Sequence, residues 1–244
     1  MASRCDRFDD FLWTTKQGER LSERAFSHLE PAPGVPRVAL ALWRLAAGLF
    51  LITLVAMSFK PINLAQFTHW GIYLTIIYCS LATVHEVRLR VQGEAYSELA
   101  WSQDKSPFCL WKWTSFFFEA AFVFENLIVL FYWTCLYPGI DFSTKTHFEI
   151  VCNYIDHIVP LAVLLVDMAC NRYPFNRKHL WVLMSIMVLY SVDNLTVSLI
   201  RGIPIYKPID PKKPLSYVIA LALPLLTCLI FLVWERIVAW KLRK

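Results

Sequence analysis

The sequence predicts an all-α fold, a polytopic membrane bundle of six transmembrane helices whose termini both lie on the cytoplasmic or matrix side. The chain of 244 residues is 57% hydrophobic and only 18% charged, whereas soluble domains average about 25% charged residues. Its apolar residues lie in blocks of about 20, the length that a helix needs to cross a bilayer. The basic residues are concentrated in alternate loops, which indicates a defined orientation in the membrane.

These blocks divide the chain into a polar N-terminal arm at 1–36, a membrane domain at 37–240 and a basic tail at 241–244. Apolar residues between 8 and 13 fit a short amphipathic helix on the headgroups, and a solvated tail fits the same composition. Prolines between 31 and 36 end any helix of the arm before the membrane. We expect transmembrane spans at about 38–59, 67–85, 113–137, 147–168, 180–200 and 217–239.

The basic residues give these spans a direction. Seventeen of the 24 Lys and Arg residues fall on the side of the two termini, six fall on the opposite side, and Arg44 lies within the first span. Because positively charged loops stay on the cytoplasmic side, both termini are predicted in the cytoplasm, or in the matrix if the membrane is mitochondrial. The net charge of +5 is spread over loops and ends, so it favours lipid headgroups as partners and not nucleic acid.

The fourth span is long enough to cross a bilayer yet carries a polar stripe. At about 100° per residue, the polar side chains and a proline share one face about 100° wide: Glu149, Asn153, Asp156, His157, Pro160 and Asp167. Polar groups in hydrocarbon cost several kcal/mol unless they are satisfied. We therefore expect the stripe to face a protein interior or a wet cavity. Pro160 lacks the N–H that would bond the carbonyl of Asp156, which frees that carbonyl beside His157.

Other spans supply polar side chains at matching depths. Thr75 and His157 lie roughly 12 and 15 Å from the outer ends of their spans. Further polar residues near the middle or outer half are Glu125, Asn126, Asp193 and Asn194, and those toward the inner side are Asp167, Glu119 and Arg44. Arg44 fits either a snorkelling side chain or an ion pair with an acid. Each polar residue fits either interhelical hydrogen bonding or a functional cavity.

The seven cysteines are spread singly along the chain, without a CxxC pair or the spacing of a zinc site. We interpret them as small apolar or interfacial residues. The sequence therefore predicts no metal site and no cofactor.

Four segments resemble motifs of a known family: WGIYLT at 70–75, FYWTCLYP at 131–138, NYIDHIVPLAVLLVDM at 153–168 and YKPIDPKKP at 206–214. In order and spacing they are similar to the androgen-induced-gene and androgen-dependent TFPI-regulating-protein family, most closely its rolling-stone branch, over residues 70–234. The resemblance implies a six-helix protein of the endoplasmic reticulum or plasma membrane. Some members hydrolyse fatty-acid esters of hydroxy fatty acids with a membrane-buried Thr and His.

The resemblance carries these two roles onto Thr75 as nucleophile and His157 as base. The sequence departs from the hydrolase branch at Tyr154, where that branch tends to have a second His, and at Asp167, where it has Glu. In such a site Asp156, Asn153 or an acid from another helix would orient the His157 ring. Asn194 or N–H groups near Pro160 would stabilise an oxyanion. The alternative is that Thr75 has a structural role, with its hydroxyl bonded to the carbonyl four residues earlier in the same helix.

Three functions are compatible with these features. The first is hydrolysis of a lipid ester, with membrane lipids and a fatty-acyl substrate as partners. The second is a catalytically silent accessory subunit of a larger membrane complex, for example in the mitochondrial inner membrane, with protein contacts through 1–36 and 86–112. The third is a transporter or proton relay, which no Gly/Pro-broken helix pair or internal repeat supports.

Overall fold

The computed structural model describes residues 31–59, 61–92 and 110–243. This part of the chain contains six helices that are long and apolar enough to cross a membrane, which confirms the predicted all-α, six-span fold. They are α3 (Arg37–Ser58), α4 (Phe67–Gln92), α6 (Leu110–Phe131), α7 (His147–Cys170), α8 (Arg177–Arg201) and α9 (Pro214–Lys241). Most of the N-terminal arm and most of the 86–112 loop, where partner contacts were expected, lie outside the described residues.

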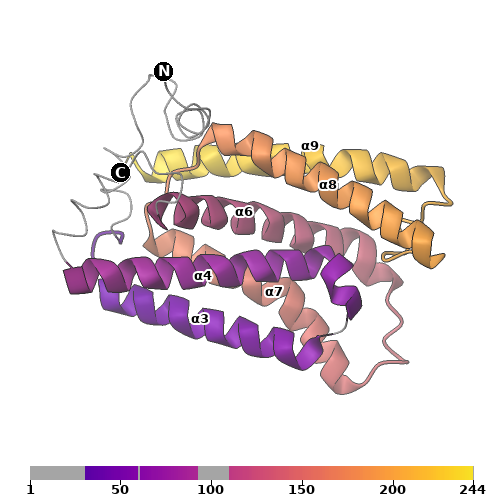
Figure 1. Cartoon of the computed structure of the whole chain (residues 1–244), viewed down its shortest axis with the longest axis horizontal. Helices are drawn as coiled ribbons and strands as arrows, with labels where there is room; N and C mark the ends of the chain where they lie inside the picture. The colour runs from indigo at the N-terminus through magenta and orange to yellow at the C-terminus, as the bar shows by residue number, and fades with distance from the viewer. Residues whose placement is uncertain (1–30, 60, 93–109, 244) are drawn as a thin grey trace, which may run out of the picture.

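The helices lie roughly side by side, and α3 begins at the same end of the bundle at which α9 ends (Figure 1). This arrangement is what an even number of spans requires. Helix α6 lies between the pair α8 and α9 and the group formed by α3, α4 and α7. Which side of the membrane holds the two ends stays a prediction.

Helix α6 is the most enclosed of the six, because α4, α7 and α9 all pack against it. Its aromatic residues Phe118, Phe122 and Phe124 are fully buried, and so are its acidic residues Glu119 and Glu125. By contrast, large apolar side chains on α3, α8 and α9 point outward, among them Leu42, Leu189, Ile200 and Leu221. Such an exposed apolar belt suits contact with lipid.

Local chemistry fixes where α7 begins. The Thr146 hydroxyl accepts from the Glu149 N–H at 3.2 Å, and the Glu149 carboxylate accepts from the Thr146 N–H at 3.0 Å. This reciprocal capping box satisfies two of the free N–H groups at the helix start. Glu149 is exposed, so it is a helix cap and not, as expected from the sequence, part of the buried stripe.

A buried ion pair lies toward the end of the bundle at which α3 begins. Arg44 Nε donates to Asp167 Oδ1 at 2.8 Å, and Arg44 Nη1 donates to Glu86 Oε1 at 3.4 Å. Asp167 also accepts from the Tyr78 hydroxyl, and from Asn171 Nδ2 at 2.9 Å. Arg44 therefore forms an ion pair with an acid of another helix and does not snorkel. These contacts connect α3, α4 and α7.

Glu119 belongs to a separate network, although the sequence placed it with Asp167 and Arg44. Its carboxylate lies 3.0 Å from His179 Nδ1 and accepts from the Asn176 N–H at 3.3 Å. Both carboxylate and imidazole are fully buried. This contact joins α6 to the start of α8.

Candidate functional site

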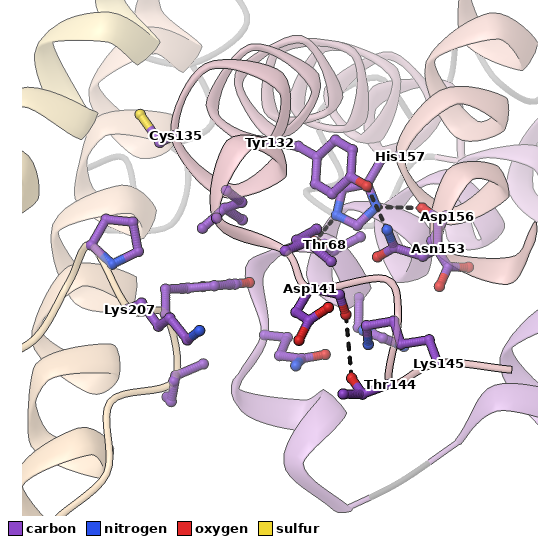
Figure 2. A pocket seen from close by; sticks show the side chains of 18 residues that line it. Thr68, Tyr132, Cys135, Asp141, Thr144, Lys145, Asn153, Asp156, His157 and Lys207 are labelled. Atoms are coloured by element: carbon purple, nitrogen blue, oxygen red, sulfur yellow. Dashed lines mark hydrogen bonds between the residues drawn. The ribbon is translucent and has the colours of Figure 1, made fainter. Parts of the chain in front are cut away.

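The ring of His157 is held between two oxygen atoms on opposite sides. Its Nδ1 lies 2.7 Å from the carbonyl oxygen of Asn153, and its Nε2 lies 3.1 Å from Thr68 Oγ1, contacts drawn as dashed lines in Figure 2. A carbonyl oxygen only accepts, so Nδ1 must carry the proton of the neutral ring. Nε2 is then free to accept from the Thr68 hydroxyl. This is the arrangement of a general base beside its hydroxyl.

Tyr132 fixes the plane of this imidazole. The two rings stack with centroids 3.6 Å apart and planes 19° apart. Asn153 Nδ2 donates to the Tyr132 hydroxyl, so Asn153 positions His157 through its carbonyl and Tyr132 through its amide. Tyr132 begins the π-helical turn η2 (Tyr132–Leu136) that follows α6. Such turns are rare in proteins overall, and those that occur are often found at functional sites.

Thr68 stands in the first turn of α4, where the helix dipole creates a local positive potential. The neighbouring Phe67 N–H donates to the Tyr206 hydroxyl at 2.8 Å. Tyr206 comes from the loop between α8 and α9, and its hydroxyl is also hydrogen-bonded to Thr68 and Tyr190. Burial raises the pKa of Tyr206 above its usual value near 10, so the phenol keeps its proton at neutral pH. A protonated hydroxyl therefore lies beside Thr68.

These groups line a cavity of about 570 Å³ that opens among the loops at one end of the bundle (Figure 2). The helices and the π turn contribute the polar lining residues Thr68, His69, Tyr132, Asn153, Asp156 and His157. The loops contribute Asp141, Thr144, Lys145, Tyr206 and Lys207. The volume is typical of a small-molecule pocket. Among the described residues, no group of three His, Cys, Asp or Glu side chains is arranged to hold a metal ion.

Thr75 takes a different position from the one that the resemblance implied. Its hydroxyl donates to the Gly71 carbonyl at 3.0 Å, a hydrogen bond within its own helix of the kind that a structural Thr makes. Because Thr68 contacts His157 and Tyr78 contacts Asp167, α4 and α7 run in the same direction. Thr75 therefore lies about 10 Å farther along α4 than Thr68. In this structure the hydroxyl that contacts His157 belongs to Thr68.

Of the predicted polar stripe, only Asn153, Asp156 and His157 line the cavity. Asp167 lies in the ion pair with Arg44. On α6, Glu125 is fully buried, and neither of its carboxylate oxygens has a hydrogen-bond partner within the described part of the chain. The position of Glu125 next to Gly71 is set by the absence of a side chain on that glycine.

The remaining predicted residues serve packing. Asn126 donates to the Phe122 carbonyl at 2.7 Å and accepts from Trp234 Nε1 at 3.3 Å, which joins α6 to α9. Asn194 donates to the Tyr190 hydroxyl at 3.0 Å. Tyr190 is in turn hydrogen-bonded to Tyr206. Asp193 lines a shallow groove at the end of α8 and lies outside the cavity.

Comparison of the chain with protein-family models, with curated proteins and with solved structures finds no match. The resemblance to the androgen-induced-gene family therefore stays a prediction.

Proposed function

We propose that this membrane protein hydrolyses an acyl ester of a lipid, with Thr68 as nucleophile and His157 as general base. The observation that carries the proposal is the 3.1 Å contact between Thr68 Oγ1 and His157 Nε2, with the proton of the neutral ring held on Nδ1 by Asn153. A hydroxyl becomes a useful nucleophile only when a positioned base removes its proton. Both groups are buried in the wall of a cavity large enough for a substrate headgroup.

The reaction would proceed in two halves. Thr68 Oγ1 bonds to the ester carbonyl carbon while its proton passes to His157 Nε2 and the carbonyl electrons move onto oxygen. The tetrahedral intermediate then expels the alcohol, which takes the proton from Nε2, and leaves an acyl ester on Thr68. In the second half a water molecule gives its proton to His157 Nε2 and attacks the acyl carbon. The second tetrahedral intermediate expels Thr68 Oγ1, which takes back the proton from Nε2, and the fatty acid is released. The Tyr206 hydroxyl lies beside Thr68 and is the donor that would stabilise the oxyanion.

The position of the cavity supports a lipid ester as substrate. It opens at the ends of helices that are long and apolar enough to cross a membrane, the level at which lipid headgroups and ester bonds lie. A volume of about 570 Å³ suits a headgroup and the first carbons of an acyl chain. The exposed apolar belt of the helices would accommodate the rest of the chain in the membrane.

The proposal is tested with purified protein in detergent or vesicles and a panel of chain-matched acyl esters. Thr68→Val and His157→Phe should lower kcat/KM by at least about a thousandfold, because removal of a nucleophile or its base has effects of this size. Thr75→Val is the matched control on the same helix and should keep near wild-type activity. Size-exclusion profiles and thermal unfolding establish that each variant is folded.

Two results would contradict the proposal. Activity that depends on Thr75 and not on Thr68 would return the nucleophile to the residue implied by the resemblance. Absence of turnover over the whole ester panel, in folded wild-type protein, would favour the catalytically silent accessory subunit.

A further inference from the structure

Two buried side chains in the cavity wall carry polar atoms without a hydrogen-bond partner in the described part of the protein. His69 is 5% exposed and Asp156 is 9% exposed. Neither ring nitrogen of His69 has a hydrogen-bond partner in the described part of the protein, and neither does Asp156 Oδ1. Folded proteins rarely leave a buried polar group unsatisfied without a reason, because the group has lost its hydrogen bonds to water. Both residues line the same cavity.

These two groups flank the Thr68–His157 pair. His69 follows Thr68 in the first turn of α4, and Asp156 precedes His157 on α7. The reaction proposed above uses neither of them. Their unsatisfied atoms are therefore placed to bind a part of the substrate next to the ester that is attacked.

The chemistry of the two groups restricts what they bind. A carboxylate oxygen accepts hydrogen bonds, and a neutral imidazole offers one acceptor and one donor. A ligand that satisfies both residues must bring hydrogen-bond donors. A hydroxyl group does so and can also accept from His69, whereas a ligand carboxylate brings no donor and would repel Asp156.

The cations of the cavity lie elsewhere. Lys145 and Lys207 are exposed on the two loops at the mouth, and Asp141 is exposed in the same region. The buried wall beside His157 therefore combines an acid with an imidazole and contains no lysine or arginine.

We propose that His69 and Asp156 form a headgroup subsite for a neutral lipid ester that bears free hydroxyl groups, with glycerol as the simplest case. The hydroxyls bond to Asp156 Oδ1 and to His69, and this places the ester carbonyl beside Thr68. The family resemblance implies a different class, esters of hydroxy fatty acids, which carry a carboxylate. As a substrate assignment the proposal rests on the proposed hydrolase function, whereas the binding that it predicts can be measured without catalysis.

Binding is measured on Thr68→Val protein in lipid nanodiscs, with a 1-O-alkylglycerol ether as a probe that no hydrolase can cleave. The chain-matched fatty acid is the competing probe. We expect saturable binding of the alkylglycerol at least about tenfold tighter than that of the fatty acid. His69→Phe and Asp156→Ala should each weaken alkylglycerol binding by about tenfold or more, the effect of losing one hydrogen bond to a buried or charged group. Asp156→Asn, which keeps an acceptor oxygen, should lose less than Asp156→Ala.

Asp193→Asn, at an acid that lies outside the cavity, is the matched control and should leave alkylglycerol binding unchanged. Fatty-acid binding that equals or exceeds alkylglycerol binding would overturn the subsite, and so would alkylglycerol binding that ignores both wall variants. Measurement of ester hydrolysis distinguishes failure of the proposed subsite from failure of the proposed hydrolase function. Wild-type protein that cleaves carboxylate-bearing esters in preference to monoacylglycerols would refute the subsite and keep the hydrolase. Selective alkylglycerol binding by a protein without esterase activity would refute the hydrolase and keep the subsite.

Discussion

Removal of the Asp167 carboxylate should strongly destabilise the bundle, because it leaves the Arg44 guanidinium buried without its main counterion. Arg44 is 1% exposed and donates to Asp167 at 2.8 and 3.4 Å. Its further contacts are with Glu86 at 3.4 Å and with the rings of Tyr78 and Tyr173 at 5.9 and 5.8 Å. A charged hydrogen bond contributes about 1.5–3 kcal/mol, and breaking a buried pair from one side costs about 3–5 kcal/mol. We therefore expect Asp167→Leu to lower the free energy of unfolding by about 3–5 kcal/mol.

The double variant Arg44→Met/Asp167→Leu tests the reason for this loss. If the cost arises from an unpaired buried charge, removing both partners should be less destabilising than the sum of the single changes, and comparable to or milder than Asp167→Leu alone. Reversible unfolding of the detergent-solubilised protein, followed by tryptophan fluorescence, measures all four species. Losses that add without coupling, or an Asp167→Leu protein within about 0.5 kcal/mol of wild type, would refute the reasoning.

Two further changes probe the surroundings of the cavity. Gly71→Ala should destabilise the protein by about 1–3 kcal/mol because its Cβ would overlap the Glu125 carboxylate. The control is Gly48→Ala, whose Cβ would meet its nearest neighbour at 3.4 Å. Equal thermal midpoints of the two variants would refute the close packing at Gly71. Tyr206→Phe leaves the Phe67 N–H without its acceptor and should cost about 1–3 kcal/mol. It should also lower kcat of ester hydrolysis at least about tenfold with little change in KM, and unchanged kcat would exclude the phenol as an oxyanion donor.

The sequence predicts the six helices well because hydrophobic blocks of about 20 residues have few alternatives to spanning helices. The ends are less predictable. The second span was expected to end near residue 85, yet α4 continues to Gln92 through a charged segment that suits a helix emerging from the bilayer. The third was expected as one continuous helix to 137, whereas α6 ends at Phe131 and passes into a π turn, which side-chain periodicity does not reveal.

The candidate site was predicted in part. The stripe on the fourth span correctly indicated Asn153, Asp156 and His157 as residues facing a cavity, because helical periodicity fixes which side chains share a face. It did not indicate Thr68, because the depth of one helix relative to another depends on tilt and packing. The signal that was available is that Thr68 and Thr75 lie seven residues, or about two turns, apart and so share a face of α4.

Tyr206 could not be placed from the sequence, since the path of a loop over the helix ends depends on tertiary contacts. The same holds for Arg44, where snorkelling and ion pairing were equally compatible with its depth. Its pairing with Asp167 was decided by the position of α7 next to α3.

Covalent labelling shows whether His157 activates the Thr68 hydroxyl. A lipid-tailed fluorophosphonate, which phosphonylates an activated hydroxyl with loss of fluoride, is incubated with the wild-type protein and with His157→Phe, and the adduct is located by tandem mass spectrometry. We predict an adduct on Thr68 in the wild-type protein and none in His157→Phe. An adduct on Thr75 would make Thr75 the nucleophile, and equal labelling of Thr68 in the absence of His157 would exclude His157 as its base.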